Sequence, residues 1–177
     1  MTNTKTILGA ALCGLCAMCG GESSVTPAAT SESDLMPVTP VTPINLMLRG
    51  DNAGSFTSVA LKAHSVHVWA DGVPQTVTLT GTHMNLANTG NAWLFATFIL
   101  PPTAVHVRVQ LQLETPGHYV NGTGSGSIDL YELPIVLDVK ASQLRARHKL
   151  VMHDDLARSF TPEGSGLLFL PDLLIKF

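Results

Sequence analysis

Three cysteines are the residues of this chain best suited to chemistry, and all three lie near its start. Cys13, Cys16 and Cys19 are spaced three apart, and no cysteine follows them. Thiolates at this spacing can ligate a metal ion, but a metal site needs three or four ligands, and no histidine, aspartate or fourth cysteine lies nearby. Covalent modification of one thiol is the chemistry we expect. The rest of the chain can form no internal disulfide and must be stable through packing.

The residues around the cysteines follow the order of an export signal. Lys5 supplies a positive charge, and residues 7–17 form an apolar, uncharged run. A charged start, a short apolar run and small residues are typical of a secretory signal peptide. The run is roughly half the ~20 residues that a membrane-spanning helix needs. We therefore expect this segment to be removed rather than to remain as a transmembrane anchor.

The end of the segment, Leu-Cys-Ala-Met-Cys-Gly-Gly, resembles the lipobox of bacterial lipoproteins. The resemblance implies that residues 1–18 are a cleaved signal peptide and that the thiol of Cys19 is diacylated. Two acyl chains are enough for stable anchoring in a bilayer. Gly20 is similar to the outer-membrane sorting pattern, which implies the outer membrane, on its periplasmic or surface face. A plain signal peptide, cut near Gly20 and carrying no lipid, is the alternative.

A change of composition separates the cysteines from the main part of the chain. Residues 19–43 are rich in Ser, Thr and Pro, and Val-Thr-Pro occurs three times in them. Such a segment buries too little apolar surface to offset the entropy of ordering it. Proline favours extended geometry, so we expect a semi-rigid tether between the lipidated Cys19 and the domain.

The overall composition indicates one folded domain, residues 44–177. The chain of 177 residues is 45% hydrophobic and 13% charged, with a formal net charge of −3. That is enough apolar material for one buried core. A weakly acidic chain offers no basic surface for nucleic acid, and we expect no nucleic-acid partner.

Alternating patterns predict that this domain is built from strands. Residues 105–114 alternate strictly, with Val107 and Val109 on one face and Arg108 and Gln110 on the other. We expect this half-buried strand to end at Thr115-Pro-Gly. Residues 59–69 form a second strand whose apolar phase changes midway, which predicts a bulge near residues 62–64. Asp71-Gly72 predicts a hairpin turn, and residues 75–80 the returning strand.

Further short strands and almost no helix complete the pattern. One helical turn at residues 144–147 is the most that we expect. Many short strands with Gly and Pro between them predict an all-β fold, a single antiparallel β-sandwich of about seven to nine strands, immunoglobulin- or transthyretin-like. The remaining expected strands are residues 92–99, 134–139, 148–153 and 166–177.

Two histidine-containing motifs could hold a metal ion. His64-Ser-Val-His67 has ligand-like spacing, but residues three apart on a regular strand point to opposite faces unless a bulge intervenes. His153-Asp154-Asp155 could bind Ca²⁺ or supply a general base. The simpler interpretation is that these residues close a strand and cap the segment that follows it. The three residues are weak metal candidates, and we expect no cofactor.

Aromatic side chains suggest a surface for sugars. Trp69, Trp93 and Tyr119 could stack against sugar rings, although tryptophan is often buried in a sandwich core. Trp93 begins an apolar run and is assigned to the core, whereas Trp69 adjoins the predicted turn and is the candidate ligand contact. The Gly-rich residues 121–127 lack the lysine and the following helix of a phosphate-binding loop, and predict a hairpin tip.

The order of segments resembles a family of uncharacterised bacterial surface lipoproteins with a transthyretin-like or immunoglobulin-like sandwich domain. The resemblance rests on four segments: residues 59–69, Leu-Pro-Pro at residues 100–102 with the strand after it, residues 155–159, and Leu-Phe-Leu-Pro at residues 168–171. It covers most of residues 44–177. The family implies the fold and a lipid anchor but no established activity.

These observations favour a non-catalytic envelope lipoprotein whose domain binds something outside the inner membrane. Its expected partners are the lipid bilayer, through the N-terminal lipid, and glycans or other envelope proteins. The alternative is a structural or adhesive subunit that assembles through exposed strand edges. An enzyme, carbohydrate-active or metal-dependent, is less favoured because we find no nucleophile with a positioned base, and we assign no catalytic residue.

Overall fold

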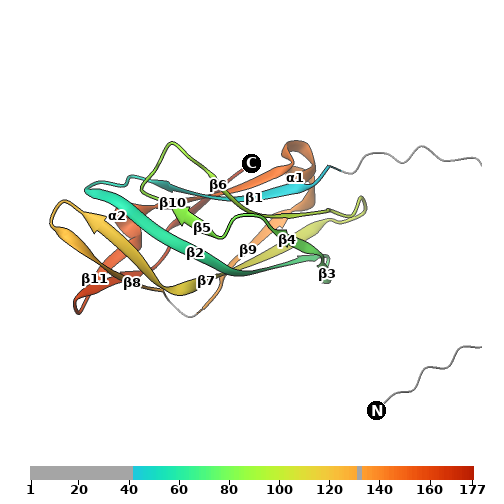
Figure 1. Ribbon diagram of the computed structural model, residues 1–177. Helices are drawn as coiled ribbons and strands as arrows, with labels where there is room; N and C mark the ends of the chain where they lie inside the picture. Colours follow the sequence, from blue (N-terminus) through green and yellow to red (C-terminus); the bar gives the residue numbers. More distant parts are fainter. Residues whose placement is uncertain (1–41, 131–132) are drawn as a thin grey trace, which may run out of the picture. The chain divides into compact units, whose positions relative to one another are not determined.

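The computed structural model describes residues 42–130 and 133–177 (Figure 1). Of these residues, 64% lie in strands and 8% in helices, and two sheets pack face to face. The expected all-β sandwich is therefore confirmed, although the described residues form thirteen strands and not the seven to nine expected. The expected signal peptide, Cys19 and most of the expected tether lie outside the described residues. No helix in the described part of the chain has the length and apolarity to cross a membrane.

One layer of the sandwich is a five-stranded sheet. Its central strand, β1, pairs with β6 in antiparallel and with β10 in parallel orientation. The sandwich is thus not wholly antiparallel, because strands far apart in the sequence can meet in either direction. The order across the sheet is β13 (Leu173–Lys176), β10 (Lys149–Asp155), β1 (Ile44–Asp51), β6 (Trp93–Phe98) and β4 (Val77–Leu79).

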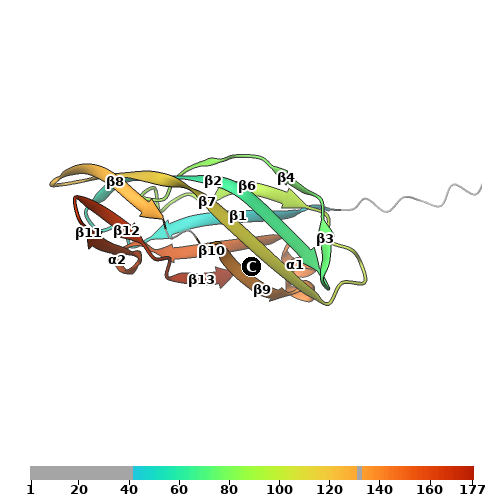
Figure 2. The same ribbon diagram turned by 90° about the horizontal axis from the view of Figure 1, so that it is seen from below.

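The other layer is an eight-stranded sheet, whose centre is the long antiparallel pair of β2 and β7 (Figure 2). β5 pairs with β2, and β9 pairs with β7, outside the main order. The main order is β11 (Phe160–Glu163), β12 (Gly166–Phe169), β8 (Gly124–Leu130), β7 (His106–Asn121), β2 (Phe56–Ala70) and β3 (Val73–Gln75), with β5 (His83–Asn85) and β9 (Ile135–Lys140) at the side.

The core lies between the two sheets and follows from the alternation of each strand. Leu46 and Leu48 of β1 and Phe95 of β6 are fully buried and face Val109 of β7 across the sandwich core. Each large apolar side chain that is fully buried contributes roughly 1.5–3 kcal/mol. The described residues contain no cysteine, so this apolar cluster holds the two sheets together without a disulfide.

The predicted bulge in the second long strand is confirmed, and it lies at His64. Ala63 pairs with Leu113 of β7, and Ser65 pairs with Gln112, so His64 is an extra residue without an opposite partner. One extra residue reverses the phase of a strand. The bulge explains why Val59 and Val66, which are seven residues apart, both face the core.

The expected end of the first long strand at Thr115-Pro-Gly is wrong, because β7 continues to Asn121. The residues at 115–117 bulge out of the pairing with β2, and the ladder resumes at His118. Gly117 then pairs with Ile128 of β8. A Cβ at Gly117 would lie 2.7 Å from Leu61 Cδ2, so the close passage of the two strands needs glycine there.

The predicted hairpin turn at Asp71-Gly72 is confirmed, with φ of +48° and +83° at these residues. The strand expected at residues 75–80 is instead divided in two. β3 pairs with β2, and β4 crosses to the other sheet and pairs with β6. The chain changes layer at Thr76, so this edge of the sandwich is closed by a connection between the two sheets.

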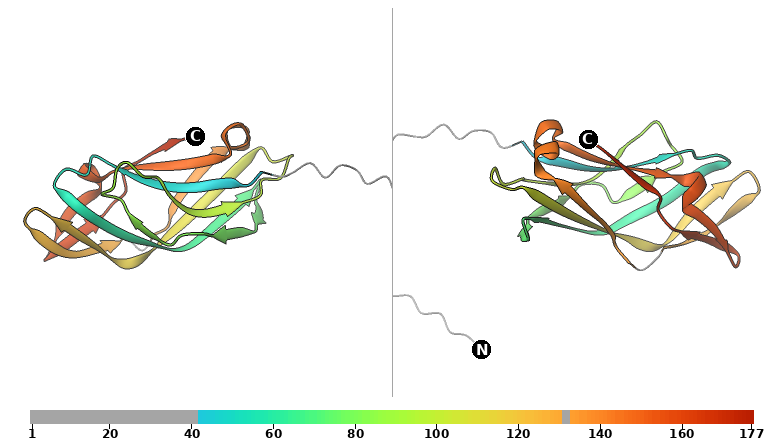
Figure 3. Two further views of the ribbon diagram at one scale, coloured as in Figure 1. Left: turned by 45° about the horizontal axis from the view of Figure 1, so that its top comes forward. Right: turned by 180° about the vertical axis from the view of Figure 1, so that it is seen from behind.

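The helices are short. α1 (Ala141–Arg147) is longer than the single turn expected, because Ala141 and Leu144 are both buried and hold its start. It ends at His148, whose left-handed φ of +53° lets its N–H donate to Leu144 O. α1 lies at the end of the sandwich where β1 begins (Figure 3). α2 (Leu156–Ser159) is one turn that follows β10.

Candidate functional site

The best candidate site is an open hollow on the outer face of the eight-stranded sheet. It has a volume of about 500 Å³. It lies beside the turn between β2 and β3, so the most regular part of the sheet forms its floor. Its lining consists of Trp69, Asp71, Gly72, His106, Arg108, Gln110 and Asp138.

Strand register assembles the floor of this hollow. Trp69 of β2 lies opposite Arg108 of β7, and Arg108 lies opposite Asp138 of β9. Side chains directly opposite each other in a sheet share a face. The row therefore places an aromatic ring, a guanidinium and a carboxylate side by side, and Gln110 lies two residues further along β7 on the same face.

Arg108 and Asp138 form a forked ion pair across the strands. Arg108 Nε lies 2.9 Å from Asp138 Oδ1, and Arg108 Nη2 lies 3.1 Å from Oδ2. These hydrogen bonds lower the pKa of Asp138 and raise the pKa of Arg108. Both side chains are more than half exposed, so the pair contributes little to stability. It does hold the two planar groups in one orientation.

Arg108 keeps hydrogen-bonding capacity for a ligand. A guanidinium has five N–H donors, and the fork to Asp138 uses two of them. The carboxylate of Asp138 can accept further hydrogen bonds. A fixed pair of this kind presents both donors and acceptors, which is what a hydroxyl-rich ligand needs.

Asp71 holds the rim of the hollow. Its carboxylate accepts hydrogen bonds from the backbone N–H of His106, at 2.8 Å, and of Val105, at 3.0 and 3.2 Å. These hydrogen bonds lower the pKa of Asp71, and the bond from His106 has the largest effect. In return, Asp71 N donates to His106 O. The β2–β3 turn is thereby tied to the start of β7, and Asp71 is a positioning residue.

Trp69, the candidate ligand contact, lies in this hollow and is half-buried. Its ring centroid is 5.9 Å from that of His67, at an interplanar angle of 32°. Sequence reasoning did not identify the other members of the floor. The alternation of residues 105–114 predicted that Arg108 and Gln110 share a polar face. No local sequence pattern pairs Arg108 with Asp138, which lies 30 residues later in the chain.

The other two aromatic candidates lie elsewhere. Trp93 packs against the core, as predicted, and its Nε1 donates to Asn85 O at 3.0 Å. Tyr119 meets Phe56 edge to face, with ring centroids 6.0 Å apart, in a cluster that continues to Phe160. Neither residue lines the hollow on the outer face of the eight-stranded sheet, which we call the Trp69 hollow.

The three residues of the His153-Asp154-Asp155 motif point to different surroundings. His153 Nδ1 lies 2.7 Å from Asp51 Oδ2. Asp155 caps α2 by accepting from Ala157 N at 3.2 Å, and it also accepts from Asn52 Nδ2 at 3.0 Å. The capping interpretation of Asp155 is confirmed. His153 and Asp155 border a second, polar hollow of about 340 Å³.

Asp154 is fully buried beneath this motif. Its Oδ1 accepts a 2.8 Å hydrogen bond from Ser159 Oγ, while its Oδ2 is buried without a hydrogen-bond partner. Burial raises the pKa of Asp154 to about 7. A carboxyl group that faces the core cannot share a ligand with the outward-facing His153 and Asp155.

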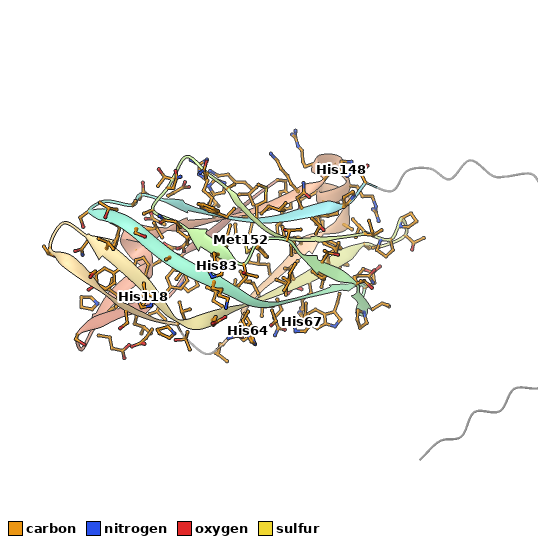
Figure 4. The ribbon with its side chains drawn as sticks, in the orientation of Figure 1. His64, His67, His83, His118, His148 and Met152 are labelled. Atoms are coloured by element: carbon orange, nitrogen blue, oxygen red, sulfur yellow. The ribbon has the colours of Figure 1, made fainter. Side chains whose placement is uncertain are left out.

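The bulge at His64 places both His64 and His67 on the exposed face of β2 (Figure 4). Within the described part of the chain, no third ligand accompanies them. Across residues 42–130 and 133–177, no three His, Cys, Asp or Glu side chains are grouped so that they could hold a metal ion. The Gly-rich residues form a hairpin tip as predicted, with Asn121 Oδ1 accepting from Thr123 N and Gly124 N at 3.0 Å each.

Comparison with known proteins gives no match. No family model, no curated protein and no solved structure matches the chain. A function is therefore inferred from the fold, the sequence motifs and the geometry of the hollow.

Proposed function

We propose that the protein is a lipid-anchored module of the bacterial envelope that binds a glycan, without catalysis, in the Trp69 hollow. The lipobox-like sequence ending at Cys19 supports the anchor and the outer-membrane address. The observation that carries the glycan assignment is the row of Trp69, Arg108 and Asp138 across three strands. An aromatic face beside oriented polar groups is suited to a sugar ring, which is apolar on one face and hydroxylated at its edge.

The charges of the hollow favour a neutral sugar. The carboxylate of Asp138 is already paired with Arg108, and that of Asp71 is occupied by backbone N–H groups. Among the described residues, the hollow therefore offers no unpaired cation to an anionic sugar, and the negative charge of Asp71 at its rim disfavours one. Gln110 adds an amide, which can both donate to and accept from hydroxyl groups.

The test is a titration of neutral oligosaccharides against residues 42–177, the part of the chain that contains both described sheets and the core between them. We expect saturable binding that Trp69→Ala weakens by about tenfold or more, equivalent to ~1.4 kcal/mol. Trp69→Phe, which keeps a smaller aromatic face, should give an intermediate affinity. His118→Ala removes an exposed ring from the same strand as Arg108, outside the hollow, and is the matched control.

Two results would contradict the proposal. One is the absence of saturable binding to any neutral glycan by the wild-type protein. The other is unchanged affinity in Trp69→Ala when circular dichroism shows that the variant is folded. The anchor is tested separately, by the mass of the N-terminus.

A further inference from the structure

β13 is the outermost strand on one side of the five-stranded sheet (Figure 2). It pairs with β10 on one side, and among the described residues no strand pairs with its other edge. Leu174, in the middle of the strand, is 60% exposed. A free strand edge with an exposed apolar side chain is a template for pairing with another chain.

The hydrogen bonding to β10 shows which backbone groups face the free edge. Asp155 N donates to Asp172 O at 3.1 Å, just before β13 begins. In an antiparallel ladder, the residues that bond to one neighbour alternate with those that bond to the other. Leu174 therefore bonds towards β10, and the N–H and C=O groups of Leu173 and Ile175 face the free edge.

The sequence of this edge is complementary to itself. When two copies of β13 run antiparallel about a two-fold axis at Leu174, Asp172 of one copy lies opposite Lys176 of the other. Leu173 then lies opposite Ile175 of the second copy, and Leu174 lies opposite itself. Each of the five positions meets a partner of matching chemistry. Leu173 and Ile175 exchange backbone hydrogen bonds at both ends of the contact.

We propose that a second copy of this chain pairs along β13 in this register, and so joins two five-stranded sheets into one continuous sheet. Asp172 already belongs to an ion pair, in which its Oδ2 lies 3.0 Å from Arg158 Nε. A carboxylate has room for a second cation on its other oxygen. The two-fold contact thus adds Lys176 of the second copy to an existing ion pair and does not break it.

The other strand edges are less suited to such pairing. β3 contains Pro74 and β11 contains Pro162, and proline has no N–H to donate to a ladder. β4 and β5 have only three residues each. In β9, a two-fold axis at Asp138 would place two carboxylates opposite each other. β13 combines free backbone donors with matching charges.

The contact is independent of the glycan proposal, because β13 belongs to the other sheet and shares no residue with the Trp69 hollow. A four-residue edge gives a small interface, so in dilute solution we expect a weak, concentration-dependent dimer. Attachment to a membrane would raise the effective concentration of the copies.

The test is sedimentation equilibrium of residues 42–177, which contain both sheets and the core, from micromolar to millimolar concentration. We expect the wild type to dimerise over this range. Lys176→Asp and Asp172→Lys should each be monomeric. The two-fold contact contains the facing pair of residues 172 and 176 at both of its ends, so each substitution creates two pairs of like charges. An equimolar mixture of the two variants should dimerise, since each facing pair then has opposite charges. Lys140→Asp makes the same charge change on β9 and should dimerise like the wild type.

Amide hydrogen exchange adds a readout specific to the register. Exchange at Leu173 and Ile175 should slow by about tenfold or more as dimer forms, whereas exchange at Leu174 is already slow in the monomer. A wild type that is monomeric at millimolar concentration would overturn the proposal. So would dimerisation of folded Lys176→Asp alone, or a mixture of the two variants that stays monomeric.

Discussion

Ser159 Oγ donates a 2.8 Å hydrogen bond to Asp154 Oδ1, and the same Oγ accepts from Asp172 N at 2.9 Å. One buried hydroxyl therefore links β10, α2 and the backbone that leads into β13. The carboxyl group in this link has a second oxygen, Oδ2, that is buried without a hydrogen-bond partner. This end of the five-stranded sheet therefore contains a buried carboxyl group, that of Asp154, whose ionisation is unfavourable.

The stability of the domain should fall as pH rises because of Asp154. Burial raises its pKa from 3.8 to about 7 in the folded state, so the unfolded chain loses this proton first. The folded state is therefore favoured below the unfolded pKa. This contribution is lost progressively between about pH 4 and pH 7, and it amounts to roughly 2–4 kcal/mol. Above pH 7 the loss is complete.

Asp154→Asn should remove this dependence. At pH 8 we expect the variant to be more stable than the wild type by roughly 1–3 kcal/mol. Chemical denaturation between pH 5 and pH 8 measures the effect. Asp129→Asn, on the exposed side of β8, is the control, and its free energy of unfolding should depend on pH as that of the wild type does. If the free energy of unfolding depended on pH equally in the wild type and in Asp154→Asn, the explanation by a buried carboxyl group would be contradicted.

Asp71→Ala should loosen the rim of the Trp69 hollow. The variant loses the acceptor for Val105 N and His106 N, and it places alanine at a φ of +48°, which favours Asn, Asp or Gly. We expect a lower melting temperature and weaker glycan binding. Because the folded pKa of Asp71 is lowered, its stabilising effect is present above the unfolded pKa of 3.8 and is lost as pH falls below it. Asp71→Asn, which tolerates this φ, should melt higher than Asp71→Ala.

Gly50→Ala should destabilise the domain strongly. A Cβ at Gly50 would lie 2.1 Å from the backbone oxygen of Leu86 and 2.9 Å from Leu156 Cδ1, so β1 would have to move. We expect a loss of about 2–4 kcal/mol in the free energy of unfolding. Gly90→Ala is the matched control, because the nearest atom to its Cβ is 3.6 Å away, and its stability should change by less than about 0.5 kcal/mol.

The lipid anchor predicts a specific mass at the N-terminus. In the membrane fraction of a bacterial host, the mature chain should begin at Cys19 and carry two or three acyl chains. Cys19→Ser should abolish the lipid, whereas Cys16→Ser should keep it, because the proposed cleavage before Cys19 would remove Cys16. An unmodified chain that begins near Gly20 would support the plain signal peptide instead.

Local patterns in the sequence were enough to predict many of the strands, the bulge and the first hairpin, but they did not predict β1, the central strand of the five-stranded sheet. A strand alternates with a period of two, so the phase change between Val59 and Val66 already required an extra residue. The turn at Asp71-Gly72 needs residues that tolerate positive φ, and these two do. Neither signal depends on any distant part of the chain.

The extent of some elements could not be read in this way. Thr115-Pro-Gly has the composition of a turn, yet the chain continues as β7 because β2 and β8 supply pairing partners on both sides of it. Residues 75–80 have a uniform strand pattern, yet they divide between two sheets. Pairing partners outside the local sequence outweigh local preference in both places.

The sequence by itself determined the all-β class and the faces of the long strands, because each follows from short-range patterns. Only the tertiary structure decided which faces meet. It brought Trp69, Arg108 and Asp138 into one row, buried Asp154 and left the edge of β13 free. These outcomes depend on register and strand order, which the packing of the whole core selects among many arrangements with equally good local patterns.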